Sequence, residues 1–209
     1  MPLPIAVVVP HLPSREWFFE GFCMPSINAN DPGAVMVLEG KESVQEKRNK
    51  GVKGATNMGT EFVFFCDDDV VLRSDCLDKL YRKLLDNPKA GYAYSDYLGI
   101  PIPPGVSPLG GVFHQKSQPF DPVTLRKNNY ISTMSLVRLS AFQKTSGFDP
   151  AIKRFQDWDL WLTMAEQGIV GVQVPETLFH AYYLDQGIST TVPMEEALQV
   201  VRKKHGISA

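Results

Sequence analysis

The sequence predicts an α/β fold, a single Rossmann-like domain with a largely parallel, mixed central sheet and flanking helices. Short β-branched and aromatic runs, typical of strands buried on both faces, alternate along the chain with stretches of helical periodicity. This alternation favours parallel strands joined by helices. The 209 residues are 44% hydrophobic, enough for one sizeable core, and contain no repeat or linker-like segment, so we expect 1–209 to form one domain.

The elements of the first half follow one another with short connections. The run Ile5–Val9 is β-branched and stops at a proline, which predicts a first buried strand. Ser14 can cap a helix over 14–28, and Ser74 can cap a later helix with an apolar stripe from Leu77 to Leu85. Around these elements we expect a strand over 34–38, a helix over 43–58, and strands over 61–66 and 91–97.

The second half starts with a change in composition. Residues 99–122 are rich in Pro and Gly, and so long a loop in a compact domain is usually a lid or an insertion. We therefore interpret 99–122 as a loop that can close over a ligand. Beyond it we expect a strand over 131–139, a short helix from Ser140 to Gly147, a helix over 157–167, a strand over 170–174 and an amphipathic helix over 193–205.

Composition disfavours several classes of protein. The net charge is −2 with no broad basic field, so we expect no strong general binding to nucleic acid. No apolar run approaches the ~18 residues of a membrane span, and the amino terminus lacks the basic region of a signal peptide. Cys23, Cys66 and Cys76 form no CxxC pair and suit reduced thiols, so we expect a cytoplasmic protein.

Three consecutive aspartates, Asp67, Asp68 and Asp69, follow the apolar run 62–66. In open α/β sheets ligands bind outside the carboxyl ends of the strands, which is where these carboxylates should lie. They would repel one another unless something neutralised them, and a divalent cation with phosphate attached is the natural choice. The alternative is a solvated turn in which one aspartate caps the next helix.

Several short segments, each weak alone, form a more specific pattern together. They are Val7–Pro10, Lys47–Gly51, Phe64–Asp69, Ser74–Leu80, Gly147–Pro150 and Gln156–Leu162. In these segments and in their order, the chain resembles family 2-type glycosyltransferases of the GT-A fold, within the nucleotide-diphospho-sugar transferase superfamily. The resemblance covers about residues 5–190.

The resemblance implies a metal site. Asp67 and Asp69 match the two ends of the family's DxD motif, with Asp69 as the direct metal ligand and Asp67 facing the ribose or the metal's water shell. His180 matches a histidine that completes the metal shell in many such enzymes; the alternative is a packed or surface histidine. Oxygen ligands together with phosphates suit Mn²⁺ or Mg²⁺. Such a metal would stabilise the charge on a leaving nucleoside diphosphate.

The resemblance also implies a nucleotide-binding edge. Pro10 and His11 should lie along the nucleotide, and Arg48 can reach the base or the diphosphate, or remain a solvated helix charge. Asp68 can touch the nucleoside or shape the turn. The donor would be a nucleoside-diphosphate sugar, and we favour a UDP-sugar. Glu39 stands where the family usually carries an aspartate pair that contacts the nucleoside, which weakens the choice of uridine over guanosine or thymidine.

On the acceptor side, Asp157 matches the family's general base. A sugar hydroxyl must lose its proton as it attacks, and a carboxylate within hydrogen-bond reach can accept that proton. Gln156 stands where the family usually has Glu, which removes a charge near the acceptor. Trp158 can stack on a sugar or pack in the core. Asp159 could compete as the base, but its spacing turns it to another face of the helix.

These correspondences predict a metal-dependent inverting glycosyltransferase that moves a sugar from a nucleoside-diphosphate sugar to a hydroxyl acceptor of unknown identity. The donor-nucleotide half would span about 1–98 and the acceptor half about 99–209. Two alternatives stay open. One is a nucleotidyltransferase of similar fold, although Pro10–Pro13 replaces its usual Gly-rich signature. The other is a catalytically degenerate nucleotide- or sugar-binding module, which Gln156 and Glu39 would fit.

Overall fold

One curled sheet organises the protein in the computed structural model, which describes residues 1–102, 111–183 and 192–208. The strand order is β2-β1-β3-β7-β5-β8-β4, with β6 paired to β5. The strands are β1 (Leu3–Pro10), β2 (Pro32–Leu38), β3 (Phe62–Phe65), β4 (Val70–Leu72), β5 (Ala90–Pro101), β6 (Phe113–Gln115), β7 (Leu136–Arg138) and β8 (Val170–Tyr183).

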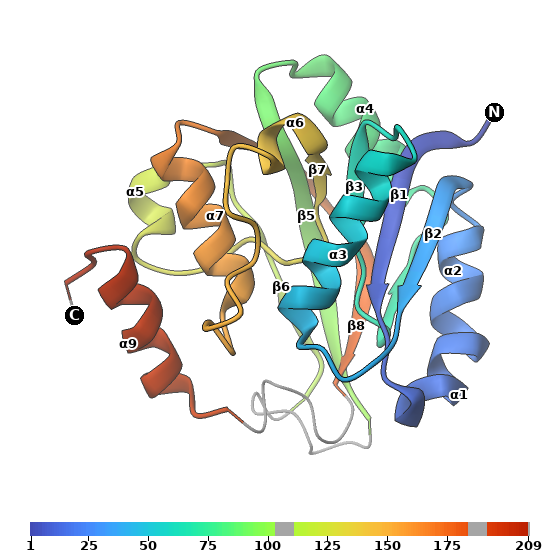
Figure 1. Cartoon of the computed structure of the whole chain (residues 1–209), viewed down its shortest axis with the longest axis horizontal. Coiled ribbons are helices and arrows are strands. Elements are labelled where there is room, and N and C mark those ends of the chain that lie inside the picture. Colours follow the sequence, from blue (N-terminus) through green and yellow to red (C-terminus); the bar gives the residue numbers. More distant parts are fainter. Residues whose placement is uncertain (103–110, 184–191, 209) are drawn as a thin grey trace.

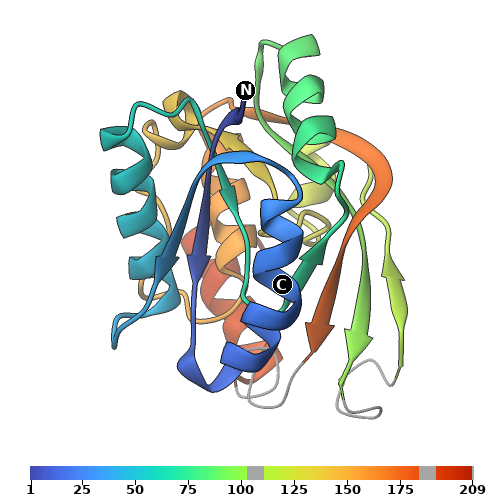
Figure 2. The ribbon, with the colours of Figure 1, turned by 90° about the vertical axis from the view of Figure 1, so that its right-hand side faces the viewer.

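Helices cover both faces of this sheet (Figure 1). In the perpendicular view, α3 stands on one side of the strands and α4 on the other (Figure 2). Among the described residues, no helix combines the length and the apolar character that a bilayer span requires. The helical segments are η1 (Pro13–Arg15), α1 (Glu16–Phe18), η2 (Phe19–Cys23), α2 (Met24–Asn28), α3 (Val44–Asn57), α4 (Cys76–Asp86), α5 (Pro122–Leu125), α6 (Leu139–Phe142), α7 (Gln156–Glu166) and α9 (Met194–Lys204).

The predicted α/β fold class, a mixed sheet flanked by helices, is confirmed. Strands β2, β1 and β3 are parallel neighbours, as the alternation of strands and helices in the first half predicts. In the second half only β5 and β8 pair in parallel among the described strands. Strand β7 lies between β3 and β5 and is antiparallel to both. Strand β6 is antiparallel to β5, and β4 is antiparallel to β8.

The core lies on both faces of the sheet because its central strands are buried on both sides. On β1, Val7 packs in the cluster that includes Ile27 of α2, whereas its neighbour Val8 packs in the cluster that includes Trp161 of α7. Gly51 lets α3 approach β1 closely, since a Cβ at that position would clash with Val8. The glycine costs helix stability but permits the close helix–strand contact.

Several predicted boundaries are wrong in instructive ways. The helix expected over 14–28 is a succession of helical turns, η1, α1, η2 and α2, with a π-helical turn in the middle. Asp75, and not Ser74, is the N-cap residue of α4. Strand β7 covers only Leu136–Arg138 of the strand expected over 131–139, because it pairs with β3 through those residues alone.

The segment 99–122 is not a loop throughout. Strand β5 continues to Pro101 because its backbone pairs with β8 as far as Tyr183, and β6 pairs back onto β5. The rest of the expected lid includes 103–110, which lies outside the described residues. Strand β8 is correspondingly longer than the strand expected over 170–174, and β4, which the sequence did not predict, forms by pairing with it.

Candidate functional site

A cavity of about 780 Å³ opens where β1 and β3 end. One wall consists of the segment after β1, the first turn of α3 and Asp67–Asp69, which leave β3. The opposite wall consists of 129–134, Pro150 and the segment 153–157, which leads into α7. The end of β8 closes the cavity between them. Residues far apart in the sequence therefore face one space, at the sheet edge where α/β proteins bind ligands.

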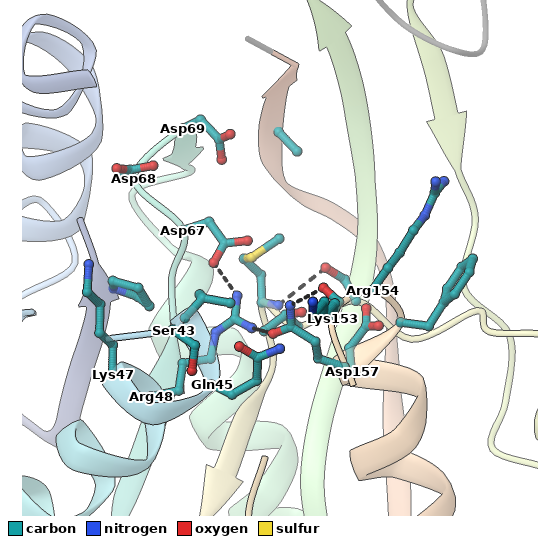
Figure 3. Close-up of a pocket in the computed structure, with 18 of the residues that line it drawn as sticks. Ser43, Gln45, Lys47, Arg48, Asp67, Asp68, Asp69, Lys153, Arg154 and Asp157 are labelled. Carbon is teal, nitrogen blue, oxygen red and sulfur yellow. Dashed lines mark hydrogen bonds and ion pairs between the residues drawn. The ribbon is translucent and has the colours of Figure 1, made fainter. Parts of the chain in front are cut away.

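Asp68 is the most enclosed of the three aspartates, with 2% of its surface exposed. Its carboxylate accepts hydrogen bonds from the backbone N–H of Leu12 at 2.8 Å and from Arg15 Nη1 at 2.9 Å, and lies 3.1 Å from His11 Nδ1. In Figure 3 it points to the other side of the backbone from Asp67 and Asp69. Asp68 thus ties the segment after β1 to the end of β3.

Asp69 shares Arg15 with Asp68. Arg15 Nη1 donates to Asp69 Oδ2 at 2.8 Å, which gives the carboxylate one cationic partner. Burial nevertheless raises the pKa of Asp69 to about 7; Arg15 opposes this rise, and the nearby charges of Asp67 and Asp68 add to it. The negative charge at Asp69 is therefore only partly compensated by the protein.

Arg48 connects the two walls of the cavity. Its guanidinium donates to Asp67 Oδ1 on the first wall (Figure 3). It also donates to Gln156 Oε1, 2.7 Å away, at the start of α7 on the opposite wall. It lies over the ring of Phe148, and its Nε is buried without a partner among the described residues. A capping box formed by Ser43 and Glu46 fixes the start of α3, the helix that carries Arg48 in its second turn. Arg48 is thus a buried strut and not a solvated charge.

Asp157 lies in the first turn of α7 and lines the cavity. Its Oδ1 accepts a hydrogen bond from the backbone N–H of Trp158 at 2.8 Å. Burial raises the pKa of Asp157, while the Trp158 N–H, Arg48 and Asn129 counteract the rise. Before the helix, Phe155 has a φ of 62°, a left-handed conformation that is rare for a bulky residue. This strained turn aims the first turn of α7 at the cavity.

The cavity brings together most of the sequence-predicted site residues. The predicted residues that line the cavity are Pro10, His11, Arg48, Asp67, Asp68, Asp69, Gln156 and Asp157. Three others are placed elsewhere: Glu39 is exposed after β2, His180 pairs with Val71 within the sheet, and Trp158 is buried with its indole N–H bonded to Leu125 O. The roles assigned to all these residues remain predictions.

Two cations on the wall that carries Asp67–Asp69 were not predicted. Arg15 contacts two of the three aspartates, and Lys47 donates to the backbone oxygen of His11. Lys47 lies beside Arg48 in a helix already assigned to the site, so its position was within reach of sequence reasoning. Arg15 reaches the site only because the chain folds back through η1, and no local pattern indicates that.

The acidic residues fit a divalent cation that also binds phosphate. Asp67 and Asp69 each use one carboxylate oxygen to bind an arginine side chain, Oδ1 of Asp67 and Oδ2 of Asp69. The other oxygen of each accepts no side-chain hydrogen bond from the described residues. Among the described residues, no group of three or more His, Cys, Asp or Glu side chains is arranged to hold a metal ion by itself. Mg²⁺ is commonly held by one or two carboxylates plus substrate phosphates and water.

Comparison with known proteins establishes the fold. No family model matches the chain, and no curated protein does. Among solved structures, Staphylococcus aureus TarS 1-349 in complex with UDP-GlcNAc matches with a TM-score of 0.71 and 13% identity, over 99% of this chain and 66% of that one. The same protein in complex with UDP gives 0.64 and 14%, over 99% and 65%.

The chain therefore shares the GT-A-like fold of these structures, as the sequence resemblance predicts. It spans less than two thirds of the length of the TarS chains that it matches, and only 39% of full TarS. At 13–14% identity, the likeness concerns the arrangement of the backbone. Activity and substrates must be argued from the cavity itself.

Proposed function

We propose that the protein is a metal-dependent inverting glycosyltransferase that moves a sugar from a nucleoside-diphosphate sugar to a hydroxyl acceptor. One observation carries the proposal: Asp67 and Asp69, at the end of β3, face the same cavity as Asp157, which lies almost ninety residues downstream. An acidic pair suited to a diphosphate with its metal thus lies opposite a carboxylate suited to accept a proton.

The wall that carries Asp67–Asp69, which we call the donor wall, would bind the diphosphate. Asp67 and Asp69 would hold Mn²⁺ or Mg²⁺, and that ion, when bound, stabilises the charge that develops on the leaving diphosphate. Arg15 and Arg48 supply fixed positive charge on the same wall. Pro10 and His11 would border the nucleoside at the end of β1. The TarS structures that share this fold hold UDP or UDP-GlcNAc, so UDP-sugars are the first donors to test.

The opposite wall, which includes 153–157 and which we call the acceptor wall, would activate the attacking hydroxyl. Asp157 is half-buried and faces the cavity from the first turn of α7. Its raised pKa makes it a stronger base than an exposed aspartate, which suits proton removal from a sugar hydroxyl. A base on the wall opposite the diphosphate allows attack from the side away from the leaving group. Such a single displacement inverts the anomeric centre.

A thermal-shift panel tests the donor site. UDP-, GDP-, dTDP- and CDP-sugars would each be added with Mn²⁺ and, separately, with chelator. A donor at one hundred times its Kd should stabilise the fold by about 2.7 kcal/mol, or roughly 5–10 °C in a chain of this length. We expect one nucleotide class to do so in Mn²⁺ and to lose most of the effect in chelator. If no nucleotide shifts the melting temperature in either condition, the proposal is wrong.

A further inference from the structure

Arg15 binds two carboxylates of the donor wall through one nitrogen. Its Nη1 lies 2.9 Å from Asp68 Oδ1 and 2.8 Å from Asp69 Oδ2. The arginine side chain is 14% exposed and lines the cavity. A guanidinium in this position occupies part of the space that a divalent cation at Asp69 would fill. It also neutralises part of the negative charge that would attract the cation.

Asp68 and the η1 turn fix the position of Arg15. Asp68, which accepts one of its hydrogen bonds, is itself held by the backbone N–H of Leu12 and contacts His11. The η1 turn that carries Arg15 starts at Pro13 and closes with a hydrogen bond from Arg15 N to Leu12 O. Asp68 therefore anchors the arginine, while Asp69 is the partner that would bind a metal.

The rest of the guanidinium can serve a ligand. Arg15 Nη2 and Nε donate no hydrogen bond to any of the described residues, whereas Nη1 is fully used. Guanidinium groups bind phosphate oxygens through such paired donors. One side chain thus contacts a proposed metal ligand, lines the cavity where a diphosphate would lie, and keeps donors that no described residue uses.

We propose that Arg15 makes divalent-cation binding depend on nucleoside-diphosphate binding. Without nucleotide, the positive charge of Arg15 opposes a cation at Asp69 and competes for its carboxylate. With a diphosphate bound, the guanidinium pairs with phosphate and the cation takes the carboxylate. By linkage, the cation must then tighten the nucleotide by the same factor as the nucleotide tightens the cation. This inference rests on the proposed function, since it requires the diphosphate site.

The test measures binding and not turnover. Mn²⁺ binding would be followed by the electron paramagnetic resonance signal of the free ion, with and without UDP, in the wild type, Arg15→Gln and Arg15→Lys. UDP binding would be measured by calorimetry in chelator and in Mn²⁺. Arg82→Gln is the matched control, because Arg82 is exposed on α4 and pairs only with Asp78 among the described residues.

Removal of the Arg15 charge should strengthen the binding of Mn²⁺ alone and weaken its coupling to UDP binding. In Arg15→Gln, Mn²⁺ alone should bind about tenfold more tightly, and the factor by which UDP strengthens Mn²⁺ binding should fall by a similar amount. Arg15→Lys keeps the charge and should restore the weak binding of Mn²⁺ alone. Arg82→Gln should match the wild type.

Two failures can be told apart. If Arg15 is only a structural strut, Arg15→Gln will weaken Mn²⁺ and UDP together and lower the melting temperature, which would overturn the inference. The inference is equally wrong if both ligands bind Arg15→Gln as they bind the wild type. If the wild type binds none of UDP, GDP, dTDP and CDP, alone or with Mn²⁺, the proposed function itself fails.

Discussion

Two faces of α7 treat the same kind of side chain in opposite ways. On the cavity face, the carboxylate of Asp157 has one backbone N–H at 2.8 Å and a raised pKa. On the face towards α9, Asp159 is 1% exposed, with Lys204 Nζ at 2.8 Å and His205 Nε2 at 2.9 Å. Asp157 is half-buried and forms no salt bridge with any described residue, whereas Asp159 is buried and paired with two cations.

The difference separates a functional charge from a structural one. The raised pKa of Asp157 means that its carboxylate is harder to ionise in the folded chain than in the unfolded chain, so its charge costs stability near neutral pH. Asp159 is buried more deeply, yet a lysine and a histidine compensate it. A carboxylate that faces a cavity without an ion-pair partner among the described residues marks a candidate functional site more strongly than burial alone.

Asp157→Asn should have the largest effect and should act on activity alone. Loss of the proton acceptor should lower the rate of sugar transfer by about 10²–10⁴-fold, the usual contribution of a positioned base. The melting temperature should stay the same or rise, because the variant removes a charge that the fold disfavours. Initial rates with the nucleotide sugar selected by the thermal-shift panel, together with a melting curve, check both expectations.

The outcome also separates an enzyme from a binding module. A binding module would bind the nucleotide sugar equally in the wild type and in Asp157→Asn, and neither would turn it over. If Asp157→Asn retains full activity, Asp157 is not the base. If it melts well below the wild type, the carboxylate is structural and the contrast between the two faces of α7 disappears.

Asp159→Asn should act on stability. Removal of one partner from a buried ion pair typically costs 3–5 kcal/mol, and we expect about 3 kcal/mol because asparagine keeps one hydrogen bond. Lys204 also retains Asp149, at 2.8 Å. Urea unfolding measures the loss, while the transfer rate of the folded fraction should stay near that of the wild type. A stable variant with low activity would instead place Asp159 in the reaction.

Local signals made the first half of the fold predictable. The β-branched run of β1 and the Ser43 capping box of α3 identify their elements without help from distant residues. Strands β4 and β6, of three residues each, carry no such signal. They exist because β8 and β5 extend far enough to pair with them, which no short window of sequence reveals.

The candidate site was predictable where chemistry is concentrated in one segment. The three consecutive aspartates Asp67–Asp69 indicate a charged site by themselves. The role of Asp157 as the base was predicted from the family resemblance. Sequence reasoning expected a metal to neutralise the aspartates, and it missed that Arg15 and Arg48 already do part of this. Both arginines reach the carboxylates through tertiary folding, which residue type and spacing do not encode.

A substitution of His205 should have the smallest effect, but it tests selectively the face of α7 that carries Asp159. Burial of its imidazole lowers the pKa, yet hydrogen bonds with Asp159 and Glu166 raise it more, so the pKa lies above 6.5. Lys204 and Arg126 are the cations nearby, and Arg126 Nη2 donates to the backbone oxygen of His205. Protonated His205 therefore stabilises the fold fully below its unfolded-state pKa, and this contribution is lost as pH rises through the folded-state value.

His205→Gln should remove that pH dependence. Melting temperatures of the wild type and the variant would be compared between about pH 6 and pH 9, with the difference largest at the acidic end, at roughly 2–4 °C, and smaller as pH rises. Because the comparison subtracts every other histidine, including the buried His11, the remaining slope belongs to the cluster of Asp159, Glu166 and His205. A difference that stays constant across the range would mean that His205 packs against α7 without a charge, and that Asp159 relies on Lys204 alone.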